Sequence, residues 1–295
     1  MKIASYLEEK RRKVDHFLGS IFPGDGSSAR LKEAIRYSLL AGGKRIRPIL
    51  LIAASEACGA GSKIEELTLP VGASLEMIHT YSLIHDDLPA MDNDSLRRGR
   101  PTNHKVYGEA MAILAGDSLL TEAFHLVSSL KIKNPRLLLE VIREIASAAG
   151  VDGMAGGQAL DLGAEGRKIS PEELENLHRL KTGCLIRAAV VSGAILAGAD
   201  EEQLAAIRKY GLAVGLAFQI ADDILDVEGE SKVLGKTAHS DAAHKKSTYP
   251  SLLGLEKSRQ LARESTDRAI SALRIFDDHA DPLREIAQYI VTRSF

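Results

Sequence analysis

A helical apolar periodicity recurs along almost the whole chain, and this feature most restricts the fold. Apolar residues return every three to four positions, which places them on one face of a helix. Aromatic residues make up only 4% of the chain and Trp is absent, so the residues that favour strands are scarce. No fixed-period repeat and no linker-like Pro/Ser/Gly stretch divides the sequence. We therefore expect one all-α domain over residues 1–295, a bundle of about ten or more helices.

Glycine and proline mark where the predicted helices begin and end. Ser170, Pro171 and Glu173 form a capping-box signature for one helix, and Asp200 is placed to cap another. The Gly-rich segments 22–28, 153–166 and 229–235 are predicted to be loops. The predicted helices cover residues 31–39, 48–58, 70–88, 109–130, 135–154, 171 onward, 201 onward, 211–227, 249–276 and 282–292.

Composition and charge exclude several classes of partner and location. The net charge of −2 lacks the broad positive surface of a nucleic-acid binder. No uninterrupted apolar run reaches the roughly 20 residues that span a bilayer, and residues 1–14 contain no apolar signal core. Cys58 and Cys184 lie far apart in apolar surroundings, as expected for reduced thiols. We expect a cytoplasmic protein without a nucleic-acid partner or a membrane span.

The strongest chemical signal is an aspartate cluster at the end of an apolar helix, Asp86-Asp87-Leu88-Pro89-Ala90-Met91-Asp92. Carboxylates beside apolar residues are costly unless cations neutralise them. Pro89 is expected to end the helix, so that Asp86 and Asp87 project from its last turn and Asp92 follows from the loop. Carboxylate oxygens in this arrangement suit Mg²⁺, which also binds substrate phosphates.

A second cluster, Asp222-Asp223-Ile224-Leu225-Asp226, lies on another apolar helix. Asp222 and Asp226 are four residues apart and share a helix face, and Gln219 lies on the same stripe. A single cluster of this kind is as readily a solvated helix end. Two such clusters, far apart in sequence, predict a multi-metal site around a diphosphate.

Basic segments that could complete an anion site lie near both clusters. Gly42-Gly43-Lys44-Arg45-Ile46-Arg47-Pro48 places three cations in a glycine-flanked turn before a helix, where backbone donors also point at a ligand. Arg97-Arg98-Gly99-Arg100 follows the first aspartate cluster, and His79 and Ser82 share a helix face with Asp86. Solvated surface charge is the alternative for each basic run taken alone. Lys181-Thr182-Gly183 and Lys236-Thr237 are weaker signals of the same kind.

Taken together and in this order, these motifs resemble the trans-isoprenyl diphosphate synthase (polyprenyl synthetase) family, nearest to its bacterial farnesyl-forming members. The resemblance covers nearly the whole chain. It also includes Gly156-Gly157-Gln158 with Asp161, Phe218-Gln219 before the second cluster, and Lys246-Ser247-Thr248-Tyr249-Pro250. It implies helices around a deep central cavity, a homodimer, and Mg²⁺-dependent condensation of isopentenyl diphosphate with dimethylallyl or geranyl diphosphate to farnesyl diphosphate.

The resemblance also implies roles for individual residues. Asp86, Asp92, Asp222 and Asp226 would bind Mg²⁺, with about three ions per site once substrate is present. Lys44, Arg47, His79 and Arg98 would hold isopentenyl diphosphate. The allylic diphosphate would be held by Arg97, Lys181, Thr182, Gln219 and Lys236. Thr182 and Gln219 would also lie beside the carbocation that forms.

The length of the product is expected to depend on the helix before the first aspartate cluster. Tyr81 lies five positions before Asp86, roughly 7–8 Å along the helix, where a ring would block a growing chain. We therefore assign chain-length control to Tyr81 and its neighbour Ser82 and expect the C15 product. Packing of Tyr81 in the core alone is the alternative, in which case a C20 product is open.

Two other classes of function stay open. A class I terpene cyclase shares the fold, but it normally replaces the second aspartate cluster and has no use for Lys44, Arg47 and His79 as a second diphosphate site. A non-catalytic helical partner protein would not need two carboxylate clusters on apolar helices.

Overall fold

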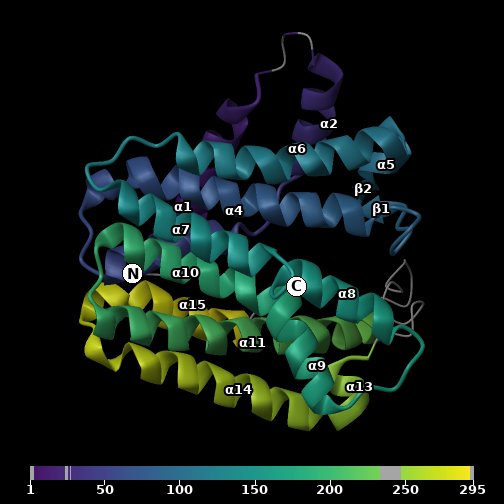
Figure 1. Ribbon diagram of the computed structural model, residues 1–295. Coiled ribbons are helices and arrows are strands. Elements are labelled where there is room, and N and C mark those ends of the chain that lie inside the picture. Colours follow the sequence, from purple (N-terminus) through teal and green to yellow (C-terminus); the bar gives the residue numbers. More distant parts are fainter. Residues whose placement is uncertain (1–2, 24–25, 27, 233–246, 293–295) are drawn as a thin grey trace.

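The computed structural model describes residues 3–23, 26, 28–232 and 247–292 as a bundle of helices (Figure 1). The single pair of strands among these residues is a two-residue hairpin in which Leu96 faces Pro101 and Arg97 faces Arg100. The elements are α1 (Ile3–Ile21), α2 (Ala29–Leu39), α3 (Ile46–Ala57), η1 (Ser62–Ile64), α4 (Glu65–Asp86), β1 (Leu96–Arg97), β2 (Arg100–Pro101), α5 (Asn103–Tyr107), α6 (Glu109–Ser128), α7 (Pro135–Ala149), α8 (Met154–Ala164), α9 (Pro171–His178), the π-helical η2 (Arg179–Gly183), α10 (Cys184–Ala197), α11 (Glu201–Lys232), α13 (Tyr249–Leu253), α14 (Leu255–Ala272), η3 (Leu273–Ile275), η4 (Asp278–Ala280) and α15 (Asp281–Thr292). The all-α prediction is confirmed.

Helix α10 lies inside the bundle, because nearly every one of its side chains is apolar and buried. It packs against α3, α7 and α11. A Cβ atom on Gly193 would lie 2.1 Å from the carbonyl oxygen of Leu51, so the absence of a side chain lets α10 and α3 approach closely. In Figure 1, α4 and α6 lie side by side on one side of α10, and α11 and α14 on the other.

Local sequence signals set several helix ends as expected. The Ser170 hydroxyl accepts from the Glu173 backbone N–H at 3.2 Å, and the Glu173 carboxylate accepts from the Ser170 N–H at 2.7 Å. The Asp200 carboxylate caps α11 by accepting from the Gln203 N–H at 2.8 Å. These contacts are local in sequence, so the residue pattern alone predicts them.

The predicted loop at 153–166 is wrong, because most of this segment is α8. Glycine favours loops on average, yet here it allows a close approach between two elements. A Cβ on Gly157 would lie 2.2 Å from the backbone nitrogen of Lys181, so α8 can rest against η2 only with glycine at this position.

Several other boundaries differ from the prediction. Helix α4 begins at Glu65, and Pro70 lies inside it. The two helices predicted after 201 and over 211–227 are one continuous helix, α11. The predicted 249–276 helix is divided at Gly254, whose φ of +79° favours a residue without a Cβ.

By length and apolar composition alone, three helical stretches within the described part of the chain are long and apolar enough to cross a membrane: Glu109–Ser128, Pro171–Ala197 and Glu201–Glu228. From the sequence we expected no membrane span, because we counted only uninterrupted runs of apolar residues. Of the window in Pro171–Ala197, 72% is buried inside the protein, against 33% in Glu109–Ser128 and 44% in Glu201–Glu228.

Candidate active site

The first aspartate cluster lies where α4 ends. Asp86 is the last helical residue, and Asp87 caps the helix as predicted from Pro89. The chain then turns back, and the Asp92 backbone N–H donates to the Asp86 carbonyl oxygen at 2.9 Å. This turn holds the backbone of Asp92 beside that of Asp86, although six positions separate them in sequence.

Asp87 differs from its neighbours because it is buried, with 3% of its surface exposed. Its carboxylate accepts from the Arg97 Nε at 2.7 Å and from a second guanidinium nitrogen at 2.6 Å. Burial raises the pKa of Asp87, and the Arg97 charge opposes this shift. Asp87 therefore anchors the hairpin through Arg97, and Asp94 lies 3.5 Å from the same guanidinium.

Three residues of the second cluster region form a hydrogen-bonded chain on α11 and η2. The Thr182 hydroxyl donates to the Gln219 Oε1 at 3.0 Å, and the Gln219 Nε2 donates to the buried Asp223 at 2.8 Å. The second Asp223 oxygen accepts from the Tyr249 backbone N–H at 3.0 Å. This network fixes the direction of the Gln219 amide. Asp223 is a buried anchor, whereas Asp222 and Asp226, which the helix spacing placed on one face, are less buried.

Lys181 and Thr182 come from η2, a π-helical turn that joins α9 to α10. Such turns are rare and are frequent at functional sites. The Lys181 ammonium donates to the Asp161 carboxylate of α8 at 2.6 Å. Beside it, both side-chain amide atoms of Gln158 are buried and lack a hydrogen-bond partner within the described residues. Gln158 was not assigned a role from sequence, and the Gly156-Gly157-Gln158 run is the signal that pointed to it.

Two arginines of the glycine-flanked basic turn, Arg45 and Arg47, differ in their surroundings. Arg45 is buried and binds Asp15 at 2.8 Å, Glu76 at 3.1 Å and the Leu39 carbonyl oxygen at 2.9 Å. Its φ of +52° is one of three positive values among the described non-glycine residues, and the others are at Asn93 and Arg98. Such strained backbone clusters at functional sites.

Arg47, two residues on, has a buried Nε atom without a hydrogen-bond partner within the described residues. Burial lowers the pKa of Arg47, while the carboxylates of Glu76 and Asp222 favour its charge. The influence of Asp222 places the basic turn within electrostatic reach of the second aspartate cluster. Lys44 is exposed at the start of the same turn.

His79 and Arg98 share the environment of Arg47. Burial lowers the pKa of His79 well below 6.5, and the positive charges of Arg47 and Arg98 lower it further. The Arg98 guanidinium donates to the Gly42 carbonyl oxygen, and a Cβ on Gly43 would lie 3.1 Å from that guanidinium. The structure thus brings residues 42–47, 79 and 97–98 together from three separate segments.

Tyr81 and Ser82 lie one turn before the first aspartate cluster. The Tyr81 ring packs edge-on against His85 with centroids 5.7 Å apart, and the Ser82 hydroxyl donates to the His79 carbonyl oxygen at 2.9 Å. The His85 Nε2 lies 3.2 Å from the Ile113 carbonyl oxygen on α6. The His85 ring thus connects α4 to α6, and the Tyr81 ring packs against it.

The aspartates differ from a preformed metal cage. Within the described ranges, no group of three or more His, Cys, Asp or Glu side chains converges closely enough to hold a metal ion. Mg²⁺ commonly takes only one or two protein carboxylates and fills its other positions with water and substrate phosphate, so the oxygen donors present fit this ion. Lys236 lies outside the described residues.

Comparison with known proteins agrees with this arrangement. A farnesyl diphosphate synthase of Geobacillus stearothermophilus is 45% identical over 295 residues, which cover 99% of this chain and 98% of that protein. A geranylgeranyl diphosphate synthase of Cyanophora paradoxa is 46% identical over 294 residues, covering 99% and 97%. The solved structure of an FPP/GFPP synthase from Zymomonas mobilis superposes with a TM-score of 0.87 at 39% identity, covering 98% of this chain and 99% of that one. The sequence model of the polyprenyl synthetase family matches residues 28–286, and the chain belongs to this family.

Proposed function

We propose that this chain joins isopentenyl diphosphate head to tail with dimethylallyl or geranyl diphosphate and releases farnesyl diphosphate. One observation carries the proposal. The Arg47 Nε is buried without a hydrogen-bond partner among the described residues, in a turn that the Arg98 guanidinium contacts at the Gly42 carbonyl oxygen, and the charges of Asp222 and Arg98 both act on the pKa of Arg47. A site for two diphosphates needs both, since cations bind one anion directly and carboxylates bind the other through metal ions.

Mg²⁺ is the cofactor we propose, with Asp86, Asp92, Asp222 and Asp226 as the residues that would hold it. When bound with the allylic substrate, about three ions supply Lewis-acid stabilisation of the departing pyrophosphate. The aspartate oxygens suit this hard cation, which takes water and substrate phosphate as its further ligands.

The residues of this chain would divide the binding of the two substrates. Lys44, Arg47, His79 and Arg98 would hold isopentenyl diphosphate through charge-assisted hydrogen bonds. The neutral imidazole of His79 would donate one N–H. Lys181 and Lys236 would hold the allylic diphosphate, with Arg97 fixed beside it by Asp87.

The reaction would proceed by ionisation, condensation and elimination. The allylic C–O bond breaks with its electron pair leaving on pyrophosphate. The double bond of isopentenyl diphosphate, held in near-attack geometry, then forms a new C–C bond with the allylic cation. A proton leaves the resulting cation and is accepted by the released pyrophosphate, which restores a double bond. The oriented dipoles of Thr182 and Gln219 would stabilise the positive charge.

The product length is proposed from Tyr81. A tyrosine ring packed on His85 below Asp86 would limit the chain to C15. The relatives named as farnesyl and geranylgeranyl synthases are almost equally identical to this chain, so overall identity does not choose between C15 and C20.

The proposal extends to a homodimer in the cytoplasm. Helix α6 carries Ile113 and Leu114 with 44% and 51% of their surfaces exposed, which are candidates for a subunit interface. Both cysteines, Cys58 and Cys184, are free, as is usual in a reducing compartment.

Product analysis tests the proposed reaction. Purified protein is incubated with Mg²⁺, isopentenyl diphosphate and either dimethylallyl or geranyl diphosphate, and the prenyl product is sized by mass spectrometry. A dominant C15 product with both starters is expected, and chelation of the metal by EDTA should abolish it. A C20 product would keep the reaction but refute the role of Tyr81. Cyclic products, or no elongation with either starter, would refute the synthase assignment.

A further inference from the structure

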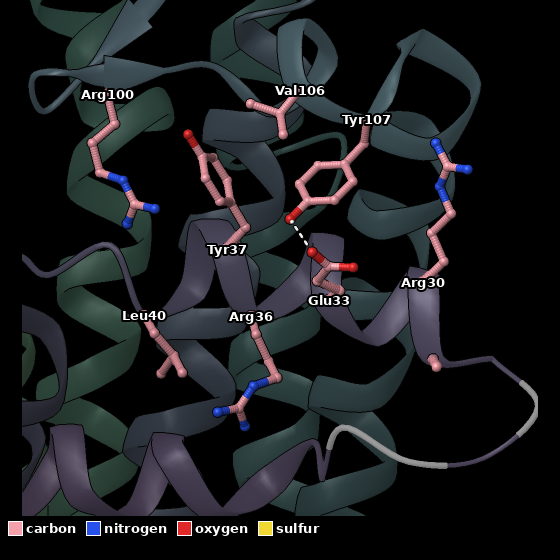
Figure 2. Close-up of a pocket in the computed structure, with 9 residues that line it drawn as sticks. Arg30, Glu33, Arg36, Tyr37, Leu40, Arg100, Val106 and Tyr107 are labelled. Carbon is pink, nitrogen blue, oxygen red and sulfur yellow. Dashed lines mark hydrogen bonds between the residues drawn. The ribbon is translucent and has the colours of Figure 1, made fainter.

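A second pocket lies outside the candidate active site, between α2 and the segment that runs from β2 into α5 (Figure 2). Its volume is about 900 Å³, which is within the range of small-molecule sites. None of the residues assigned to the proposed reaction lines it. Its lining is Ala29, Arg30, Glu33, Arg36, Tyr37, Leu40, Arg100, Val106 and Tyr107.

The pocket has an excess of positive charge. It contains three guanidinium groups and one carboxylate, that of Glu33, which accepts from the Tyr107 hydroxyl at 3.3 Å. Arg36 donates to the backbone carbonyl oxygens of Gly19 and Phe22, which carry no net charge. Within the described part of the chain, no carboxylate pairs with Arg30 or Arg100. The lining therefore favours an anion with about two negative charges.

The wall between these cations is aromatic. Figure 2 shows Arg100 and Arg30 on opposite flanks of the Tyr37 and Tyr107 rings. The two rings meet edge to face with centroids 5.5 Å apart, and the Arg100 guanidinium lies 4.3 Å from the Tyr37 centroid. The Tyr37 hydroxyl is held by the Pro101 carbonyl oxygen at 2.8 Å. An apolar or aromatic group attached to the anion would find a fixed surface here.

The hairpin connects this pocket to the candidate active site. Arg100 is directly opposite Arg97 in the strand pair, a placement in which like charges destabilise each other. Arg97 is neutralised by Asp87 and Asp94, whereas Arg100 contacts the Tyr37 ring and pairs with no carboxylate among the described residues. Tyr37 and Arg100 also line a small inner cavity together with Arg97 and Arg98. An anion bound at Arg100 would therefore affect the strand pair that contains Arg97. It would also affect Arg98, which lies in the turn between the two strands.

We infer that this pocket is an effector site for a small organic phosphate, a dianion whose organic group is apolar or aromatic. The inference rests on the proposed function, because the regulated step is diphosphate binding at Arg97 and Arg98. Occupation adds negative charge behind these arginines and draws Arg100 toward the pocket. Both effects weaken the binding of isopentenyl diphosphate, so the effector raises the KM for that substrate.

Phenyl phosphate is a suitable probe, because its phosphate is largely dianionic above pH 7 and its ring can contact Tyr37 and Tyr107. Binding is measured by titration calorimetry on the full chain with EDTA present, so that no metal-dependent site contributes. Saturable binding with one site per chain is expected, weakening as salt is raised. The double variant Arg30→Gln/Arg100→Gln should bind at least tenfold more weakly. Arg136→Gln, an exposed arginine on α7, is the matched control and should bind as the unmodified chain does.

Elongation kinetics supply the functional readout. Saturating phenyl phosphate should raise the KM for isopentenyl diphosphate roughly fivefold, at the lower end of typical couplings, with kcat little changed. The double variant should lose this response, measured against its own KM without phenyl phosphate, whereas Arg30→Gln, which leaves the strand pair unchanged, should elongate as the unmodified chain does.

Four results would overturn the inference while leaving the proposed reaction intact. The first is that an elongating enzyme shows no saturable binding of phenyl phosphate, and the second is that Arg47→Gln abolishes this binding while the double variant does not. The third is that phenyl phosphate binds without changing the KM for isopentenyl diphosphate. The fourth is that the double variant has a different oligomeric mass from the unmodified chain. The second result would place the probe in the active site. The fourth would make the pocket a contact between subunits. An enzyme that binds the probe but does not elongate would instead refute the proposed function.

Discussion

At the scale of single residues, burial differs between neighbouring aspartates of the same cluster. Asp223 is 3% exposed and holds Gln219 and the Tyr249 N–H, while Asp222 and Asp226 are less buried on the same helix. The same division separates Asp87, bound to Arg97, from Asp86. In each cluster the middle aspartate is a buried anchor.

Asp223→Asn should lower kcat by about a hundredfold while changing the KM for isopentenyl diphosphate little. Asparagine has one acceptor for two N–H donors, so the Gln219 amide or the Tyr249 N–H loses its bond and the Thr182–Gln219 dipoles lose their direction. Steady-state elongation kinetics measure the effect, with the exposed Asp152→Asn as control. An equal loss of kcat and of isopentenyl diphosphate binding would argue against a positioning role.

Tyr81→Ala should shift the product from C15 toward C20. Removing the ring opens space beside His85 below Asp86, so the chain can extend by one more unit. Mass spectrometry of the products measures the shift. Tyr289→Ala, which removes a half-buried ring on α15, should leave product length unchanged. An unaltered C15 product in Tyr81→Ala would mean that another residue sets the limit.

His79 should make stability depend on pH between 6.5 and the lowered pKa of its folded form. The unfolded chain takes up a proton near the ordinary pKa of 6.5, whereas burial and Arg47 keep the folded imidazole neutral. The unfolded state then binds more protons, so the free energy of unfolding falls as the pH drops below 6.5, by at most about 1.4 kcal/mol per pH unit. Urea unfolding of the protein and of His79→Gln across this range measures the difference. Equal slopes in both proteins would show that the folded imidazole titrates normally.

At the scale of elements, glycines decide which helices can approach η2. On α8, Gly157 lies against the Lys181 backbone, whereas Gly163 has no heavy atom within 4 Å of a Cβ built upon it. Because Gly157 and Gly163 lie on the same helix, comparing the same substitution at both positions separates the effect of close packing from that of helix propensity.

Gly157→Ala should destabilise the fold by about 1–3 kcal/mol, because the new methyl group forces α8 away from η2. Displacement of Lys181 should also lower kcat. Gly163→Ala should be neutral or stabilising by up to about 1 kcal/mol, since alanine is the better helix former. Chemical denaturation measures both variants. Similar effects at the two positions would contradict the packing argument.

At the scale of the whole molecule, the exposed apolar side chains of α6 bear on assembly. If the proposed dimer forms through α6, Leu114→Arg should shift the mass measured by light scattering from dimer toward monomer, because a charge in an apolar interface is costly when buried. Leu139→Arg, which changes an exposed leucine on α7, should leave the mass unchanged. A dimer unaffected by Leu114→Arg would place the interface elsewhere.

The sequence by itself determined the all-α class, the capped starts of α9 and α11, and the position of the first aspartate cluster at the end of α4. These features depend on periodicity, capping and proline chemistry within a few residues. Tertiary structure decided the rest: that most of 153–166 is helical, that Arg45 is buried in ion pairs while the Arg47 Nε has no hydrogen-bond partner among the described residues, and that Asp87 and Asp223 are anchors. Each depends on a partner distant in the chain, such as Lys181 for Gly157 or Glu76 for Arg45, and packing alone brings such partners together.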